Sequence, residues 1–278
     1  MFSPGSFSNP FAFALEPGGG IGKFSLRDKS SKVLINPTVM KGARVLCLGC
    51  AGQSNIANTA QNSYTTLNPT QVFNLNIWDG ALYQGQNPFM GASNGTGTAW
   101  LGRLGDKLIA TGEWDYVVLA TIAMGASAIA EHAVGGPENL KYGAAFNRMK
   151  EIGIMIGDDL NIAAWLLMQG EADKDLGTTQ ANWQAGFQSL RQSIRDRGDD
   201  APIFVAKCTY INGAASPTIR AGQTAVVNST DVFAGPDTDT LTGANRWDTT
   251  HLGDTGGDNA ANMWRDTLLA AQTAGLII

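Results

Sequence analysis

Ser54, Asp248 and His251 are residue types that, brought together, can make a hydroxyl group nucleophilic. Ser54 follows the apolar run Val45–Leu48, which predicts a buried strand with the serine just beyond its carboxyl end. Asp248 stands three residues before His251, so its carboxylate can accept the Nδ1 proton of the imidazole. The Nε2 atom is then free to take a proton from a serine. The spacing favours a Ser-His-Asp arrangement.

The chain has two histidines, so an imidazole base is either His251 or His132. Glu131 is next to His132, but adjacent side chains rarely point in the same direction. We therefore favour His251 as the base. We expect His132 to lie in a loop or on the surface of a helix.

Three polar turns that contain glycine follow apolar runs, at Gly52–Asn55, Gly125–Ser127 and Gln169–Glu171. In a parallel sheet the carboxyl ends of the strands meet at one edge, where ligands bind. A helix that begins just after Ser54 would aim unpaired N–H groups and the positive end of its dipole at the same place. This edge is therefore expected to hold an oxyanion.

Apolar runs alternate with segments of helical periodicity along most of the chain. Strands are expected at residues 45–48, 72–78, 115–121, 162–168, 202–209 and 231–234, and helices at 98–111, 141–158, 178–197, 217–227 and 256–274. This alternation predicts a three-layer α/β/α fold with a mainly parallel sheet of about five strands.

A chain of 278 residues can bury a full core as one large α/β domain. We expect this domain to extend over residues 41–278. Residues 1–40 are expected to form an N-terminal arm packed on that domain, with a possible small hairpin around Arg27–Ser30. The long loop Gly80–Gly97 is rich in Gly and Asn, and loops of this length tend to be functional.

The net charge of −5, without a basic cluster, argues against nucleic acid and anionic membrane as partners. No apolar run is long enough to span a membrane, and residues 1–20 lack the basic start and continuous apolar region of a signal peptide. The low content of charged residues slightly favours an extracytoplasmic or particle-borne location.

A metal site is not expected. Cys47 and Cys50 have a C-x-x-C spacing, but residues three apart in a strand face opposite sides and no second Cys/His pair is available for zinc. No EF-hand loop matches the acidic residues near the C-terminus, which are expected to be solvated: Asp237, Asp239, Asp254 and Asp258.

Four blocks occur in one order over residues 43–270: Gly52–Asn55, Gly125–Ile129, Gln169–Asp173 and Asp248–Leu252. Together they resemble the SGNH hydrolase superfamily, specifically its sialate O-acetylesterase and carbohydrate esterase family six (acetylxylan esterase-like) branch. The resemblance implies a flavodoxin-like α/β/α fold. It also implies a serine esterase that acts on an acetylated carbohydrate and uses neither a metal nor another cofactor.

The resemblance assigns Ser54 as the nucleophile, His251 as the general base and then acid, and Asp248 as the residue that orients His251. Glu171 remains an alternative to Asp248 as the acid. We favour Asp248 because it has the better spacing to His251.

The oxyanion hole implied by the resemblance consists of the backbone N–H groups of Ser54 and Gly125 and the side-chain amide of Gln169. A glycine at position 125 allows a backbone N–H group to approach a substrate oxygen closely. Gln53 and Glu171 are expected to support these groups from behind.

Two alternative functions remain. A lipase-like or thioesterase-like hydrolase of other short acyl esters would need an apolar channel, whereas the expected loops are rich in Gly, Asn and Thr with scattered aromatic residues that suit sugars: Trp78, Trp100 and Trp247. A non-catalytic carbohydrate-binding or structural module would be expected to have lost part of the triad, and this sequence keeps all three residues.

Overall fold

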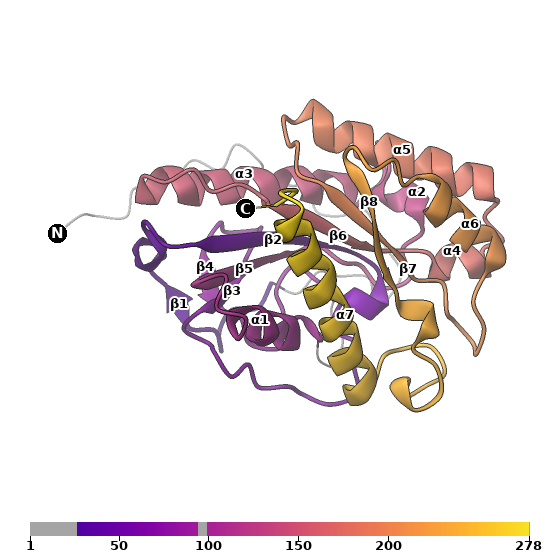
Figure 1. Ribbon diagram of the computed structural model, residues 1–278, viewed down its shortest axis with the longest axis horizontal. Coiled ribbons are helices and arrows are strands. Elements are labelled where there is room, and N and C mark those ends of the chain that lie inside the picture. Colours follow the sequence, from indigo (N-terminus) through magenta and orange to yellow (C-terminus); the bar gives the residue numbers. More distant parts are fainter. Residues whose placement is uncertain (1–26, 94–98, 278) are drawn as a thin grey trace.

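The computed structural model describes residues 27–93 and 99–277. Within them one sheet of eight strands runs through the centre of the molecule (Figure 1). Its strands follow the order β1 (Leu34–Ile35), β4 (Leu82–Gln84), β3 (Val72–Leu75), β5 (Tyr116–Thr121), β2 (Val45–Gly52), β6 (Ala164–Met168), β7 (Ile203–Lys207) and β8 (Val232–Asp237).

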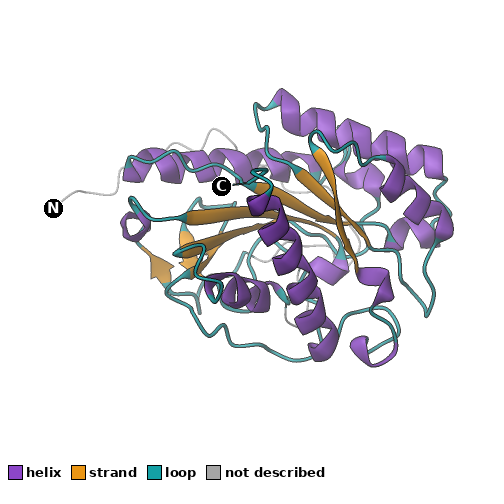
Figure 2. Cartoon of the chain, viewed as in Figure 1, coloured by secondary structure: helices purple, strands orange, loops and turns teal. Residues whose placement is uncertain are grey.

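Helices cover both faces of the sheet (Figure 2). The α-helices are α1 (Leu101–Ile109), α2 (Ile129–His132), α3 (Asn139–Ile156), α4 (Glu171–Asp175), α5 (Gln180–Asp196), α6 (Pro217–Ala225) and α7 (Asp254–Thr273). Short 3₁₀ helices occupy Pro37–Met40, Ser54–Ile56, Thr238–Thr240 and Gly243–Asn245.

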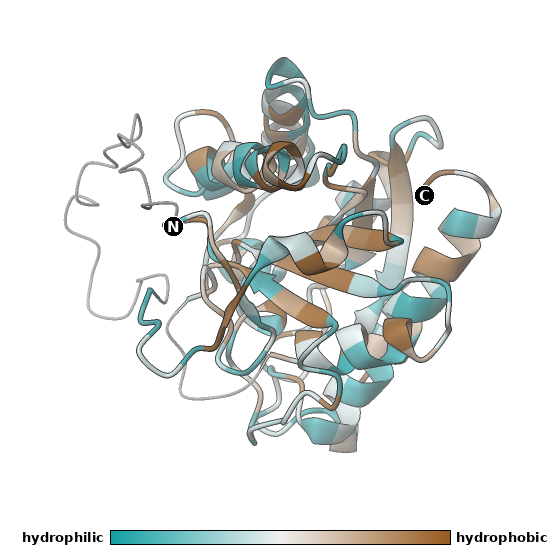
Figure 3. Cartoon of the chain, turned by 90° about the vertical axis from the view of Figure 1, so that its left-hand side faces the viewer, coloured by the Kyte–Doolittle hydropathy of each residue, from teal (hydrophilic) through white to brown (hydrophobic). Residues whose placement is uncertain are grey.

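Two hydrophobic cores lie on the two sides of the sheet. Helices α1 and α7 close one core with Leu104 and Trp264, and α3 and α5 close the other with Met149 and Phe187. Because side chains alternate along a strand, β2 supplies residues to both cores. In Figure 3 the central strands are largely hydrophobic, whereas the helices around them carry both hydrophobic and hydrophilic residues.

Cys47 and Cys50 belong to opposite cores, as the strand period predicts. Both are free thiols and fully buried, and burial raises the pKa of each thiol well above its ordinary value. Neither is an accessible reactive cysteine.

The order of the strands creates a switch point beside β2. The chain leaves β2 for β3, returns through β5 to the near side of β2, and then continues with β6 on the other side of β2. Ligands of open α/β sheets bind where the strand order reverses, at the carboxyl ends. The carboxyl end of β2 is therefore the expected site, and it is followed by Ser54.

Two features of the predicted fold need correction. The described sheet has eight strands rather than about five, because β1 and β4 add to its edge, each antiparallel to the strand beside it. Both are very short, and β4 lies in a Gly/Asn-rich stretch without alternation, so neither has a sequence signal. The parallel strands also follow the chain order 2-3-1-4-5-6, whereas a flavodoxin-like sheet has the order 2-1-3-4-5.

Most of the expected N-terminal arm, residues 1–26, lies outside the described residues. The part from Leu34 to Ile35 pairs with β4 and so belongs to the main sheet. Among the described helices, none combines the length and the apolar character that a membrane span needs.

Candidate active site

A sharp bend at Gly52 delivers Ser54 to the edge of the sheet. Gly52 has a φ of 129°, and a Cβ atom there would lie 1.9 Å from the carbonyl oxygen of Met168. The next N–H group, of Gln53, donates to that same oxygen at 3.0 Å. Only glycine fits this close approach, and the turn it permits places Ser54 at the start of a 3₁₀ helix with 8% of its surface exposed.

Gln53 ties the serine turn to the neighbouring turn at 169–171. Its buried side-chain carbonyl accepts hydrogen bonds from the N–H groups of Ala172 at 3.1 Å and Gly170 at 3.4 Å. These groups belong to the start of α4, where N–H groups lack partners within the helix. Gln53 therefore links the turn that carries Ser54 to the start of α4.

His251 and Asp248 form a hydrogen-bonded pair. The Nδ1 atom of His251 lies 2.6 Å from Oδ2 of Asp248, and Oδ1 of Asp248 accepts the backbone N–H of His251 at 2.6 Å. Burial opposes ionisation of the Asp248 carboxyl, but the hydrogen bonds from His251 and Thr250 outweigh it and hold its pKa below the ordinary value. The carboxylate therefore fixes the tautomer that leaves Nε2 unprotonated.

The loop that carries His251 is rigidly anchored. Its ends meet in an antiparallel bridge between Arg246 and Leu252. The buried Arg246 guanidinium donates to the carbonyl oxygens of Leu241 at 2.7 Å and Thr238 at 3.0 Å, and also to that of Thr250. Thr249 in the same loop has a φ of 65°, a strained value for a β-branched residue that such anchoring maintains.

Asn55 joins the serine turn to the histidine loop. Its Oδ1 atom accepts the N–H of Leu252 at 2.9 Å, and its Nδ2 group donates to the carbonyl oxygen of Thr250 at 3.2 Å. These two partners flank His251 on either side. A single buried amide thus links the turn that carries Ser54 to the loop that carries His251.

No direct hydrogen bond joins Ser54 Oγ to His251 Nε2 among the described contacts. Catalytic hydrogen bonds of this kind are often long and shorten when substrate binds. The side chain of His251 keeps 25% of its surface exposed.

Glu171 lies behind Asn55 rather than beside the imidazole. Its fully buried Oε1 atom accepts hydrogen bonds from Asn55 Nδ2 at 2.7 Å and from the thiol of Cys208 at 2.9 Å. Its Oε2 atom has no hydrogen-bond partner among the described residues. Burial raises the pKa of this carboxyl to about 7, although the hydrogen bonds to Oε1 partly offset the effect. In this geometry Asp248, not Glu171, contacts His251.

Gly125 lies close to the serine. A Cβ atom at Gly125 would be 4.0 Å from the Cβ of Ser54 and 3.3 Å from Oγ of Ser93. The backbone N–H of Gly125 donates to that Ser93 hydroxyl at 3.1 Å. Gly125 therefore lies beside Ser54, and Ser93 lies next to both as an acceptor that was not predicted from the sequence.

The amide of Gln169 is occupied at both ends. Its Nε2 group donates to the carbonyl oxygen of Ser127 at 3.1 Å and to a carboxylate oxygen of Asp173, and its Oε1 atom accepts the indole N–H of Trp183 at 2.9 Å. The side chain is 1% exposed. Gln169 would have to release Ser127 or Asp173 before it could donate to a substrate.

The sequence also matches a known protein family. The model of one family, described as carbohydrate esterase, sialic acid-specific acetylesterase, matches residues 47–269. The chain belongs to this family. No match to a curated protein sequence was found.

Solved structures share the fold of this carbohydrate esterase. A protein from Arabidopsis thaliana is 15% identical with a TM-score of 0.59, over 82% of this chain and 98% of that chain. NanS is 12% identical with a TM-score of 0.54, over 84% and 98%. A carbohydrate acetylesterase from Xanthomonas citri is 14% identical with a TM-score of 0.51, over 81% and 55%.

The other histidine of the esterase, His132, is fully buried, so its expected position in a loop or on a helix surface is wrong. Its Nε2 atom lies 2.8 Å from the hydroxyl of Ser127, and its Nδ1 atom lies 2.9 Å from that of Tyr142. Burial lowers its pKa to about 3. His132 is therefore a neutral core residue that supports the Gly125–Ser127 turn through its hydrogen bond with the hydroxyl of Ser127.

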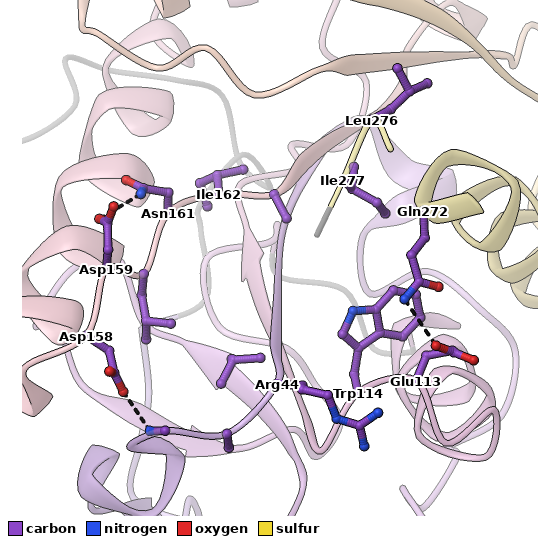
Figure 4. Close-up of a pocket in the computed structure, with 15 residues that line it drawn as sticks. Arg44, Glu113, Trp114, Asp158, Asp159, Asn161, Ile162, Gln272, Leu276 and Ile277 are labelled. Carbon is purple, nitrogen blue, oxygen red and sulfur yellow. Dashed lines mark hydrogen bonds between the residues drawn. The ribbon is translucent and has the colours of Figure 1, made fainter. Parts of the chain in front are cut away.

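A pocket of about 720 Å³ opens at the other edge of the sheet (Figure 4). It is lined by residues that precede β2, β5 and β6, among them Arg44, Trp114 and Asp159. It lies at the amino ends of these strands, whereas Ser54, Gly125 and Gln169 follow their carboxyl ends. This pocket is therefore separate from the candidate active site.

Sequence reasoning placed Asn55 and Asp173 within motif blocks but gave neither a role. Asn55 immediately follows the candidate nucleophile, and Asp173 follows Gln169 by one helical turn, so their positions were an available signal. Ser93 had no such signal, because it lies in the long Gly/Asn-rich loop.

Proposed function

We propose that this chain is a serine esterase that removes O-acetyl groups from carbohydrates through an acetyl-enzyme intermediate. The observation that supports it best is the Asp248–His251 pair, held next to the Ser54 turn by the amide of Asn55. A nucleophile, a base and an oriented acid at the switch point of the sheet are what acyl transfer requires.

In the proposed mechanism, Nε2 of His251 takes the proton of Ser54 as Oγ attacks the acetyl carbonyl carbon. Asp248 stabilises the imidazolium that forms. When the tetrahedral intermediate collapses, the bond from carbon to the sugar oxygen breaks and His251 returns its proton to that oxygen. Water, deprotonated in turn by His251, then attacks the acetyl-serine ester. The bond from carbon to Oγ of Ser54 breaks, His251 returns the proton to Oγ, and acetate leaves.

For the oxyanion hole we propose the backbone N–H groups of Ser54 and Gly125 as the donors. Ser54 opens a helical turn, whose first N–H groups lack acceptors within the turn, and Gly125 directs its N–H toward the space shared with Ser93. An oxyanion would replace the Ser93 hydroxyl as the acceptor. Because its amide is already occupied, Gln169 is assigned the role of holding the Ser127 turn in place.

The test is release of acetate from acetylated xylan, cellulose acetate, O-acetylated sialic acid and acetylated bacterial exopolysaccharides. The wild-type protein should deacetylate at least one of them, and Ser54→Ala should lose all but a few per cent of the rate while it remains folded. Mass spectrometry of a quenched reaction should find an acetyl group on Ser54. Activity retained in Ser54→Ala would exclude this serine as the nucleophile.

The same assay separates acetylesterase from lipase-like activity. For an acetylesterase, rates on p-nitrophenyl esters of increasing acyl length should fall steeply after acetate. Equal or higher rates on longer chains would favour a hydrolase of other acyl esters.

A further inference from the structure

Trp247 is the exposed tryptophan of this chain. All seven tryptophans lie within the described residues; 47% of Trp247 is exposed, whereas five others are buried and the ring of Trp78 is covered by the guanidinium of Arg27 at 3.8 Å. An exposed indole that stands alone on a surface needs no explanation. The position of Trp247 beside His251, in contrast, does need an explanation.

The ring of Trp247 is held between the two halves of the site. Its centroid lies 6.1 Å from that of His251, with the two rings inclined by 24°. Its indole N–H donates to the carbonyl oxygen of Thr59 at 3.2 Å, and the hydroxyl of Thr59 donates to the carbonyl oxygen of Ser54 at 2.5 Å. The exposed ring is therefore fixed in orientation relative to both Ser54 and His251.

The chemistry of the reaction determines which part of the substrate meets this ring. His251 must return its proton to the leaving oxygen, so the alcohol part of the ester lies on the imidazole side of Ser54. The acetyl group and its oxyanion lie on the other side, next to Gly125. A residue packed against His251 faces the alcohol, which in a carbohydrate ester is the sugar.

An indole whose N–H is satisfied within the protein presents only its apolar face to a ligand. Pyranose rings carry axial C–H groups on their faces and hydroxyl groups around their rim. Such a face stacks on an aromatic ring while the hydroxyl groups remain in water or bind polar residues.

We infer that Trp247 is the platform on which the pyranose ring that bears the acetyl group stacks during deacetylation. This inference rests on the proposed function, because it assumes that Ser54 attacks a sugar ester. It adds a specific binding residue for the sugar and fixes the side of the site on which the sugar lies.

The experiment compares Trp247→Ala and Trp247→Phe with wild type on two kinds of ester. Acetylated xylo-oligosaccharides and O-acetylated N-acetylneuraminic acid present a pyranose, whereas ethyl acetate presents an alcohol with no ring. Ile154→Ala is the matched control, since Ile154 is an exposed apolar residue near the end of α3, before the amino end of β6.

Trp247→Ala should lower kcat/KM on the sugar ester roughly tenfold, mainly through KM, and change kcat/KM on ethyl acetate less than threefold. Trp247→Phe keeps a ring and should recover much of the loss. Ile154→Ala should match wild type on both. Equal losses on both esters would overturn the inference, because Trp247 would then act on His251 rather than on the sugar.

Failure of the proposed function would look different. If wild type releases no acetate from any ester, binding of unacetylated xylo-oligosaccharide and N-acetylneuraminic acid still tests the platform by calorimetry. Wild type should bind one of them and Trp247→Ala should bind it roughly tenfold more weakly. Unchanged binding, or no binding to either, would overturn the role of Trp247.

Discussion

The side-chain carbonyl of Asn55 accepts a hydrogen bond of 2.9 Å from the backbone N–H of Leu252. The bond joins the residue after Ser54 to the residue after His251, across 197 positions of sequence. The relative position of hydroxyl and imidazole therefore depends on an amide that takes no part in proton transfer. Catalysis falls steeply with small misplacements of this kind.

Asn55→Ala should lower kcat at least tenfold with a smaller change in KM, because the histidine loop loses two hydrogen bonds to the serine turn. Steady-state kinetics on an acetyl ester would measure this. Asn139→Ala is the control: Asn139 is also buried and also bridges distant groups, His132 and Ser193. It should cost similar stability with kcat retained. Similar kcat losses in both variants would mean that Asn55 contributes only to general stability.

Asp248→Asn should reduce kcat more than Glu171→Gln does. Asp248 contacts Nδ1 of His251 directly, and an amide there can neither stabilise the imidazolium nor fix the tautomer. Glu171 reaches the imidazole only through Asn55 and the histidine loop. The opposite order of kcat values would transfer the role of the acid to Glu171.

Gln169→Ala should lower kcat and stability together. The substitution leaves the indole N–H of Trp183 without a partner in the core, at a cost of about 1–3 kcal/mol. It also removes one hydrogen bond from the carboxylate of Asp173, which keeps the one from the backbone N–H of Ile129. Urea unfolding alongside kinetics separates the two possible roles. A large loss of kcat with unchanged stability would mean that the amide donates to the oxyanion instead.

Glu171 should make the protein less stable as the pH rises. Its pKa is raised by burial from the ordinary 4.5 to about 7, so the folded state binds a proton that the unfolded state releases. The stabilisation is complete below about pH 4.5 and is lost as the pH rises through about 7, with a total near 3 kcal/mol.

Other carboxyl groups also titrate, so the measurement is the difference between wild type and Glu171→Gln. The urea midpoints of both proteins are measured at pH 5, 6, 7 and 8. The midpoint of Glu171→Gln should increase relative to that of wild type as the pH rises. A constant difference across this range would show that Glu171 has an ordinary pKa in the folded protein.

Local sequence patterns were sufficient to predict most of the fold. The apolar run at Val45–Leu48 became the core of β2, and Tyr116–Leu119 became most of β5, because a buried strand needs little beyond its own apolar residues. The edge strands β1 and β4 were not predictable in this way, since two or three residues hold no period and their pairing depends on β3.

Within the site, the pairing of Asp248 with His251 followed from a spacing of three residues and is present in the structure. The contacts of Asn55 did not follow from the sequence, because its partners Thr250 and Leu252 are about 200 residues away. The engagement of the Gln169 amide was equally hidden, since it depends on how α5 brings Trp183 against the 169–171 turn. A pairing between residues a few positions apart can be predicted from the sequence. Contacts between distant turns can be predicted only when the fold is known.

Because His132 is deeply buried, signals from an accessible histidine come from His251. A reagent that acylates imidazole from water, such as diethyl pyrocarbonate, should label His251 and leave His132 unmodified while the chain stays folded. His132 stays neutral above about pH 4 because its pKa is lowered to about 3. Its imidazole resonances in a proton NMR spectrum should therefore not move with pH above that value. An imidazole resonance that moves when sugar is added near neutrality is then assigned to His251, and the candidate active site can be followed without an introduced label.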